Sequence, residues 1–274
     1  TTNNPFYEII DEEIRTVVEN HGDVLLSRDP ALSSARQIEE IRGLIADGVR
    51  VIFINPVDGR TMREVLREAY AAQVTVIAVD TNIAEEEFVA ATVVSDNYSA
   101  GVQCATHLAA HADGGRIALL KHTEARSAAL RIEGFRAAIA QHPSFQIVAE
   151  EECSGQLEIA MPVMAELLVR HPEIDVVMAL NDPTALGAIA ALQSAGRAPG
   201  EILVYGVDGV PESRDLIRAR WMTATAVQSP RSIGRMAAEQ AYRILAGEAA
   251  EDATLPTHLL TIENVDENDG GGWD

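Results

Sequence analysis

The chain has 274 residues, 47% of them hydrophobic, which is enough to build one large core or two of medium size. Its formal net charge of −21 comes from 42 acidic against 21 basic residues. This excess of acids argues against nucleic acids and anionic membranes as partners, because both bind clustered Lys and Arg side chains. No apolar run approaches the roughly 20 residues that a membrane-spanning helix needs.

Helix-like and strand-like segments alternate along the chain. The first series comprises, in order, a helix at 8–20, a strand at 24–26, a helix at 33–46, a strand at 51–54, a helix at 60–72 and strands at 74–79 and 91–94. The second comprises helix 97–111, strand 116–121, helix 125–141, strand 145–150, helix 156–171, strand 175–180, helix 183–195, strand 201–206, helix 211–219, strand 222–227, helix 230–246 and strand 257–262. The acidic, glycine-rich tail at 263–274 is predicted to be frayed.

The predicted strands are mostly unbroken runs of Val, Ile, Leu and Ala, which are typical of strands buried on both faces of a parallel sheet. Repeated strand–helix units predict right-handed crossovers. Two such series without a flexible linker predict an α/β fold with two Rossmann-like lobes, each a parallel sheet flanked by helices. We expect one lobe to contain residues 1–95 and 229–258, and the other to contain residues 96–228 and 259–274.

One strand is missing from this alternation. Every other predicted helix follows a strand, whereas the helix near Pro5 follows only polar residues, and no basic and apolar leader precedes it. A vacant position beside 24–26 and 51–54 would leave buried strand edges unpaired, at a high cost. We therefore expect a further strand in the centre of the first sheet, supplied from ahead of Thr1 or from elsewhere. Any signal peptide is expected to be removed or to lie outside this sequence.

Polar side chains follow several of the strands at the point where each strand ends. These residues are Asn55, Asp80, Asn181 with Asp182, Asp208 and Gln228. In open parallel sheets the ligand lies outside the carboxyl ends of the strands, so residues at these ends converge on one site. The sequence therefore predicts a binding site at this edge, for a small neutral ligand rich in hydroxyl groups.

An ordered set of short motifs resembles the periplasmic sugar-binding proteins of ABC importers, of the ribose-binding type. The set covers nearly the whole chain. Its members are Thr2-Asn3-Asn4-Pro5-Phe6-Tyr7, Ile54-Asn55-Pro56-Val57-Asp58, Val79-Asp80, Val94-Ser95-Asp96-Asn97, Arg131-Ile132-Glu133-Gly134-Phe135, Asn181-Asp182-Pro183-Thr184-Ala185-Leu186-Gly187-Ala188, Gly206-Val207-Asp208-Gly209 and Val227-Gln228-Ser229-Pro230.

The resemblance implies a three-crossing hinge between the lobes and a sugar held between them. The ligand contacts that it implies are Asn4, Phe6, Tyr7, Asp80, Arg131, Asn181, Asp208 and Gln228. Their chemistry agrees with this role: aromatic rings can cover the C–H face of a sugar and exclude water. Carboxylates accept hydrogen bonds from hydroxyls, a guanidinium donates through a planar fork, and amides do both.

Two departures from the ribose-binding pattern bear on the ligand. Thr81 follows Asp80 where the ribose binders have an arginine, and no aromatic residue stands near Gly155-Gln156. The loss of one charged donor and one stacking ring argues against ribose itself. A pentose, a hexose or a polyol remains open, with Gln156 as an additional polar contact.

Each of these residues also has an ordinary structural interpretation. Phe6 and Tyr7 could form a hydrophobic staple at a helix start, and Arg131 could be a solvated helix residue. Asp208 could form a turn, and the pair Asn181-Asp182 could cap a helix. The motif context favours ligand contact for all of them except Asp182, to which we assign the structural role.

The remaining reactive side chains carry no prediction of chemistry. His107 and His111 are spaced as two metal ligands on a helix could be, but no Glu follows the first histidine, and packing or surface roles are favoured. Cys104 and Cys153 are predicted to be unpaired. The sequence contains no nucleophile elbow, P-loop or Gly-x-Gly-x-x-Gly motif. We therefore predict no catalytic residue, no metal and no cofactor.

The preferred interpretation is a solute-binding protein that binds a monosaccharide or sugar alcohol and delivers it to the permease of a bacterial ABC importer. We expect a monomer without nucleic-acid partners, in the periplasm or another extracytoplasmic location, with a lipid anchor if the host is Gram-positive. The alternative is the effector-binding core of a lactose-repressor-type transcription regulator. An enzyme would need a reactive residue beside the acids of the cleft.

Overall fold

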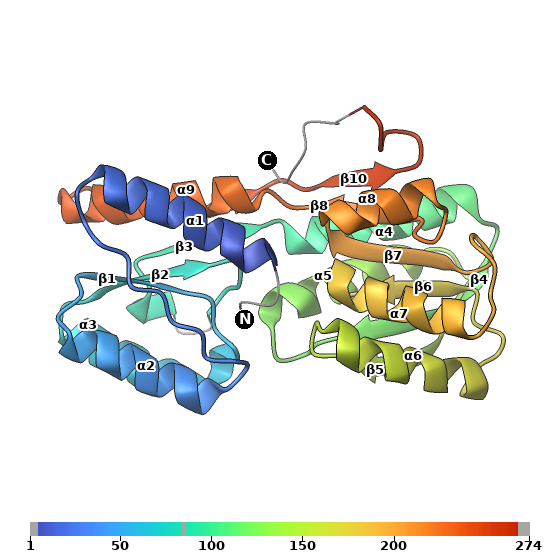
Figure 1. Ribbon diagram of the computed structural model, residues 1–274, viewed down its shortest axis with the longest axis horizontal. Helices are drawn as coiled ribbons and strands as arrows, with labels where there is room; N and C mark the ends of the chain where they lie inside the picture. The colour runs from blue at the N-terminus through green and yellow to red at the C-terminus, as the bar shows by residue number, and fades with distance from the viewer. Residues whose placement is uncertain (1–4, 84–85, 268–274) are drawn as a thin grey trace.

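Two β-sheets, each covered by helices, form two lobes that lie side by side in the computed structural model (Figure 1). The structure describes residues 5–83 and 86–267. The first sheet has the strand order β1-β2-β3-β9, and all its pairings are parallel. Its strands are β1 (Val51–Ile54), β2 (Thr75–Val79), β3 (Ala91–Ser95) and β9 (Ala253–Leu255).

The second sheet has the order β10-β8-β7-β6-β4-β5. Its strands pair in parallel, except that β10 runs antiparallel to β8 at the edge. The strands are β4 (Gly115–Lys121), β5 (Phe145–Glu152), β6 (Val176–Ala179), β7 (Leu203–Asp208), β8 (Ala224–Val227) and β10 (His258–Thr261). The predicted fold class, α/β with two parallel-sheet lobes flanked by helices, is confirmed.

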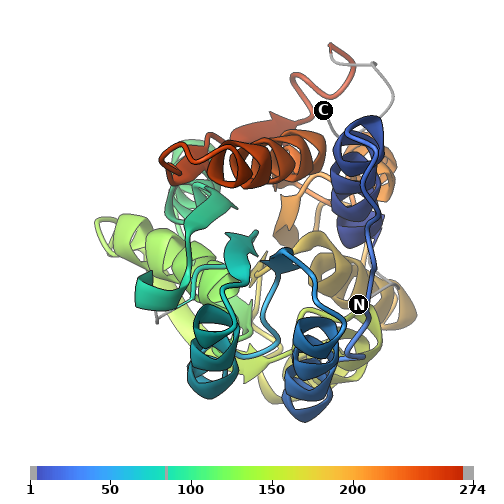
Figure 2. The same ribbon diagram turned by 90° about the vertical axis from the view of Figure 1, so that its left-hand side faces the viewer.

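Helices cover both sheets. In the first lobe α1 and α9 lie on one side of the strands and α2 and α3 on the other, as Figure 2 shows end-on. The α-helices are α1 (Pro5–Asn20), α2 (Ser34–Ala46), α3 (Arg63–Ala71), α4 (Asn97–His111), α5 (Arg126–Ile139), α6 (Leu157–Arg170), α7 (Asp182–Ser194), α8 (Pro211–Arg218) and α9 (Pro230–Leu245); η1 (Gly59–Thr61) and η2 (Glu86–Phe88) are short 3-10 turns.

Local sequence explains where several helices begin. The side chains of Ser33 and Asp96 accept hydrogen bonds from the backbone N–H groups of Arg36 and Ser99, the third residues of α2 and α4, which would otherwise be unpaired in the first turn. Pro211 and Pro230 stand at the first positions of α8 and α9, where a missing N–H has no cost.

The chain crosses between the sheets three times, after β3, after β8 and between β9 and β10. Helix α9 packs against α1 and against β2 and β3, so the chain returns to the first lobe after β8. This path supports the proposed division into 1–95 with 229–258 and 96–228 with 259–274.

Two predictions about strands were wrong. Residues 24–26 form no strand, although their composition favours one, because no neighbouring strand satisfies their backbone groups in the described structure. Strand β9 was not expected; it is only three residues long and contains no clear apolar run. The further strand expected beside β1 stays a prediction, since no described residue pairs with the outer edge of β1.

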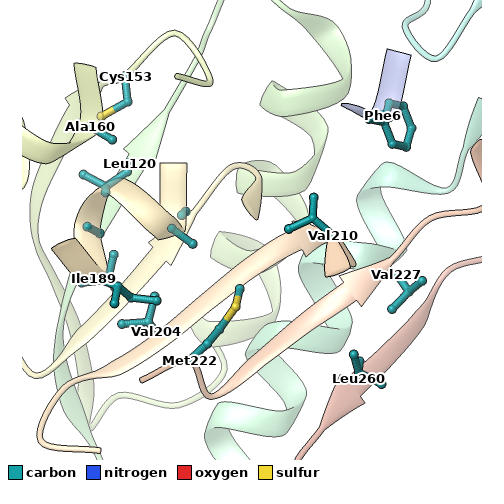
Figure 3. Packing of buried hydrophobic residues seen from close by; sticks show 14 of the residues in the cluster. Phe6, Leu120, Cys153, Ala160, Ile189, Val204, Val210, Met222, Val227 and Leu260 are labelled. Atoms are coloured by element: carbon teal, nitrogen blue, oxygen red, sulfur yellow. The ribbon is translucent and has the colours of Figure 1, made fainter. Parts of the chain in front are cut away.

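Buried side chains connect the two lobes. One cluster extends from Ile10 and Ile14 of α1, through strands β2 and β3, to the face of the second sheet covered by α6 and α7. Figure 3 shows part of it, from Cys153 and Ala160 to Leu260, with Phe6 beyond Val210 and Val227. A second cluster lies under α4 and α5, and a third under α2 and α3.

Candidate functional site

A cavity of about 850 Å³ opens between the lobes at the carboxyl ends of the strands and continues into the first lobe. Asn4 lies outside the described residues. The other seven predicted ligand contacts all line this cavity: Phe6, Tyr7, Asp80, Arg131, Asn181, Asp208 and Gln228. Phe6 and Tyr7 begin α1, Asp80 follows β2, and Gln228 lies in the crossing after β8. The other three come from the second lobe: Arg131 from α5, Asn181 from the start of α7 and Asp208 from the end of β7. Only closure of the two lobes brings these residues together.

Arg131 is placed by close contact between α4 and α5. A Cβ on Gly101 would lie 1.9 Å from the carbonyl oxygen of Arg131, and a Cβ on Gly134 would lie 2.1 Å from that of Tyr98. Only glycine permits this separation, which brings α5 close enough for Arg131 to reach the edge of the second sheet. The arginine is 4% exposed, so its interpretation as a solvated helix residue is wrong.

The Arg131 guanidinium is fixed by three acceptors. Its Nε donates to Asn97 Oδ1 at 2.8 Å, and its Nη1 donates to the Leu180 carbonyl at 3.0 Å and to Asp208 Oδ1 at 3.2 Å. A buried charge pair of this kind is held by its hydrogen bonds as well as by its Coulomb attraction. The fork is therefore oriented before any ligand arrives.

Asp208 ends β7 with a φ of 136°, a backbone conformation that L-residues rarely adopt. Asp182 holds the following turn, because its Oδ2 accepts from the Gly209 and Val210 amides at 2.8 and 2.9 Å and from the Ser213 hydroxyl at 2.8 Å. Asp182 thus has the structural role assigned to it.

The Asp208 carboxylate also accepts from Gln228 Nε2 at 2.7 Å. Burial raises the pKa of Asp208 to about 8, although the nearby Arg131 guanidinium acts in the opposite direction. One oxygen of Asp208, Oδ1, accepts hydrogen bonds from both Arg131 and Gln228. These bonds connect the end of β7 to α5 and to the crossing after β8.

Asp80 ends β2 with a φ of 66°, so both cleft acids occupy left-handed backbone conformations. Its Oδ2 accepts from Asn55 Nδ2 at 2.9 Å, and the Tyr7 hydroxyl lies 3.5 Å from the same oxygen. Its Oδ1 and Gln228 Oε1 are both buried, and neither has a hydrogen-bond partner among the residues that the structure describes. Burial raises the pKa of Asp80. Two acceptor atoms facing one cavity thus lack donors.

The two aromatic residues at the start of α1 meet edge to face, with ring centroids 5.6 Å apart. Phe6 is buried in the core cluster and also lines the cavity, so it combines a packing role with that of a wall. Tyr7 is half-buried, and burial raises its pKa. Both rings lie on the first-lobe side, which agrees with the predicted apolar wall.

Asn181 has a structural function that the prediction did not give it. Its Oδ1 accepts from the Thr184 amide at 3.0 Å and caps α7, while its Nδ2 donates to the Gly155 carbonyl at 3.2 Å. The helix-capping interpretation is therefore correct for Asn181, which nevertheless lines the cavity. Gln156, next to Gly155, lines the cavity too.

A family model described as "Periplasmic binding protein domain" matches residues 1–249. The chain belongs to this family. The ribose import binding protein of Salmonella typhimurium is 30% identical over 264 residues, covering 96% of this chain and 88% of the relative. That of Bacillus subtilis is 32% identical over 264 residues, covering 95% and 85%. These matches confirm the resemblance to the ribose-binding type.

Solved structures of the periplasmic binding protein family share the fold. An ABC transporter solute-binding protein from Mycobacterium smegmatis with bound glycerol superposes with a TM-score of 0.91 at 30% identity, covering 98% of this chain and 94% of that one. A Caulobacter myo-inositol binding protein bound to myo-inositol gives 0.90 at 28% identity, covering 97% and 92%. Within the described ranges, this periplasmic binding protein has no helix long and apolar enough to cross a membrane.

Four polar residues of the site are absent from the predicted ligand contacts. Asn55, which the strand-end rule had placed at this edge, binds Asp80, and Asn97 binds Arg131. Thr81 and Ser127 share a hydrogen bond of 2.8 Å between their hydroxyl oxygens, which joins the two lobes across the cleft. Ser127 lies one helical turn before Arg131, on the same face of α5.

His107, His111 and the two cysteines do not line the cavity. The His107 and His111 rings stack 4.0 Å apart, and His107 Nδ1 lies 3.0 Å from the Tyr205 hydroxyl. Cys104 and Cys153 are free and buried, which confirms the prediction that they are unpaired; burial raises the pKa of each thiol to about 12. In the part of the chain described, no three side chains gather as metal ligands would.

Proposed function

We propose that this periplasmic binding protein binds a monosaccharide or sugar alcohol between its lobes and presents it to the membrane permease of an ABC importer. The observation that carries the proposal is a pair of buried acceptors in residues lining one cavity, Asp80 Oδ1 and Gln228 Oε1, for which residues 5–83 and 86–267 supply no donor. A buried acceptor without a donor costs roughly 1–3 kcal/mol. Ligand hydroxyls would supply the missing donors.

The charges of the site favour a neutral ligand. Asp80 and Asp208 offer acceptors and would repel a ligand carboxylate or phosphate, while Arg131 is already engaged by Asp208 and Asn97. A ligand amine would lose its hydration and would lie close to the Arg131 guanidinium. Hydroxyl groups satisfy acceptors and donors alike without a charge to desolvate.

The departures at Thr81 and Gln156 support a ligand other than ribose. Thr81 is buried, and its hydroxyl forms a hydrogen bond with the Ser127 hydroxyl. The residue after Asp80 is therefore not a charged donor. Named relatives of the protein include a D-allose-binding and a D-apiose import binding protein as well as ribose binders. This variety supports a pentose, hexose or polyol as the class to be tested.

The family assignment supports the remaining parts of the proposal. Its relatives are import and solute-binding proteins, which supports transport over the effector-binding core of a repressor and over an enzyme. We propose that the protein acts as a monomer in the periplasm, or outside the membrane and anchored to it by lipid. No nucleic acid takes part in this function.

A thermal-shift screen with pentoses, hexoses, glycerol and inositols tests the proposal. A ligand at about 100 times its dissociation constant adds roughly 2.7 kcal/mol of stability, which is a readable shift. Calorimetric titration of the best compound should then give one site per chain. Stabilisation by amino acids or by anions, with no response to any sugar or polyol, would contradict the proposal.

A further inference from the structure

One close hydrogen bond orients the Asp80 carboxylate. Asn55 Nδ2 donates to Asp80 Oδ2 at 2.9 Å, whereas the hydroxyl oxygens of Tyr7 and Thr81 both lie 3.5 Å from that oxygen. Hydroxyl donors normally approach an acceptor to about 2.5–3.0 Å, so the bond from Asn55 is the firm one. It engages Oδ2 and leaves Oδ1, for which the described residues supply no partner, to a ligand.

Asn55 is held in turn by Gln37, the fourth residue of α2. Gln37 Nε2 donates to the backbone carbonyl of Asn55 at 2.8 Å, and Gln37 Oε1 accepts from the backbone N–H of Val57 at 2.9 Å. Because one end of the amide meets an acceptor and the other meets a donor, these partners fix its orientation. A single side chain thus clamps the loop at 55–57.

Gln37 stands at a position where burial alone would favour an apolar residue. It is 7% exposed, and Ile38 and Ile41 of the same helix pack into the cluster under α2 and α3. An amide is buried at low cost only when its donor and its acceptor are both bonded, as they are here. The loop at 55–57, rather than the packing of α2, therefore explains why this residue is glutamine.

We propose that Gln37 is a positioning residue of the ligand site, which acts through Asn55 on Asp80. In this Gln37–Asn55–Asp80 relay, Gln37 fixes the loop, the loop fixes Asn55, and Asn55 holds the carboxylate so that its Oδ1 meets a ligand hydroxyl. The inference rests on the proposed binding of a sugar or polyol. Gln37 needs no contact with the ligand for this role, because both ends of its amide are bonded within the protein.

Loss of the relay would add an ordering step to ligand binding. The terminal torsion of an aspartate side chain has broad minima, so a carboxylate without its neighbour turns readily. Binding would then include the entropy of fixing both the loop and the carboxylate, and preorganisation raises affinity by removing that term. The relay residues belong to α2 and to the ends of β1 and β2, all in the first lobe (Figure 1). The relay therefore exists before the lobes close.

A purely structural role for Gln37 makes a different prediction. If Gln37 only joins α2 to the end of β1, its loss lowers the stability of the fold and leaves Asp80 unchanged. If it acts through Asn55, its loss changes Asp80 in the same direction as the loss of Asn55 does. The two roles are separated by measurements on Asp80 and by the coupling between Gln37 and Asn55.

The first test is a double-mutant cycle with Gln37→Leu, Asn55→Ala and the double variant. Leucine keeps the approximate size of the side chain among apolar neighbours and removes both hydrogen bonds; Gln37→Met replaces it if the leucine variant does not fold by circular dichroism. Gln193→Leu changes an exposed glutamine of α7 and is the matched control. Calorimetry measures the dissociation constants of D-ribose, D-allose, myo-inositol and glycerol.

Gln37→Leu should weaken binding of the tightest of these compounds about three- to tenfold, and Asn55→Ala about tenfold. The double variant should bind no more weakly than Asn55→Ala alone, because Gln37 acts only through Asn55. Gln193→Leu should bind like wild type. Losses that multiply in the double variant, or an unchanged affinity in Gln37→Leu, would overturn the proposal.

A second measurement, without ligand, separates this inference from the proposed function. Burial raises the pKa of Asp80, while the Arg131 guanidinium and the hydrogen bond from Asn55 lower it. Carboxyl carbon NMR titrations should therefore show the pKa of Asp80 raised further in Gln37→Leu, as in Asn55→Ala, and unchanged in Gln193→Leu. A wild-type pKa of Asp80 in Gln37→Leu would overturn the positioning role. If that pKa rises and none of the four compounds binds, the relay is supported and the proposed ligand class is what fails.

Discussion

At the scale of single residues, the site depends on buried acids in unusual backbone conformations. Asp80 follows β2 of the first sheet and Asp208 ends β7 of the second, and both have positive φ values. Asparagine tolerates such conformations better than alanine does, so Asn is the cleaner replacement. The burial and the hydrogen bonds of the two carboxyl groups determine their pKa values and which atoms they can offer to a ligand.

Loss of Arg131 or Asp208 should weaken ligand binding. A hydrogen bond to a charged group contributes about 1.5–3 kcal/mol, and each 1.4 kcal/mol is tenfold in affinity. Arg131→Ala and Asp208→Asn should each raise the dissociation constant of the best ligand about tenfold or more by calorimetry. His107→Ala and His111→Ala, on the far side of α4, should leave it unchanged. The reverse pattern would mean that the ligand lies elsewhere.

The pH dependence of stability should carry the signature of Asp208. Burial raises its pKa to about 8 in the folded protein, above the ordinary value of 3.8, so the folded state binds the extra proton between these limits. The stability that Asp208 contributes is therefore full below about pH 4 and is lost as pH rises to about 8.

Histidines also titrate in this pH range and change the stability of both proteins alike. The comparison of wild type with Asp208→Asn therefore isolates the contribution of Asp208 to the free energy of unfolding. The unfolding free energy of wild type, minus that of the variant, should fall by about 4 kcal/mol between pH 5 and pH 8.5 in denaturant titrations without ligand, because each pH unit below the folded pKa changes it by about 1.4 kcal/mol. A difference that stays constant over this range would show that Asp208 is ionised throughout.

At the scale of elements, the contact between α4 and α5 determines where Arg131 lies. The two helices approach so closely that the backbone of α5 lies against Gly101 of α4, and the backbone of α4 lies against Gly134 of α5. The sequence pattern predicted both helices to within two residues but contained no information on their separation. The structure shows that glycines at these two positions permit the short separation between α4 and α5.

Gly101→Ala should destabilise the protein and weaken binding together. Its Cβ would meet backbone atoms of Arg131 and Phe135, which cannot move independently, so we expect a loss of about 1–3 kcal/mol of stability. Gly43→Ala is the matched control: it lies within α2 with nothing within 4 Å of its new Cβ, and should gain about 0.5–1 kcal/mol. Denaturant midpoints measure both; equal effects would contradict the packing argument.

At the scale of the whole molecule, ligand binding depends on contacts that exist only when the lobes meet. The hydroxyls of Thr81 and Ser127 bond across the cleft, and Arg60 pairs with Glu124 at 3.2 Å nearer the surface. The buried pair should matter more, because an exposed ion pair contributes little.

Thr81→Val should lower ligand affinity about three- to tenfold without loss of fold, because it removes a hydrogen bond made only in the closed form. Thr81→Ser keeps the hydroxyl and should bind like wild type. Ser194→Ala removes an exposed hydroxyl of α7 that bonds within its own helix, and serves as control. Titration calorimetry distinguishes them, and a Thr81→Val variant of unchanged affinity would exclude a role in closure.

The sequence by itself determined the helices, most strands, the two-lobe α/β class and the polar residues that follow the strands at the cleft. These follow from apolar runs and from polar residues at strand ends, which are local patterns. Residues 24–26 show where local pattern fails: a strand needs a partner, and partners are set by the whole sheet. Tertiary structure alone decided that Asn181 caps a helix, that Thr81 meets Ser127, and that Asp208 is buried against Arg131 and Gln228. Each depends on groups distant in the chain, whose separation no spacing in the sequence records.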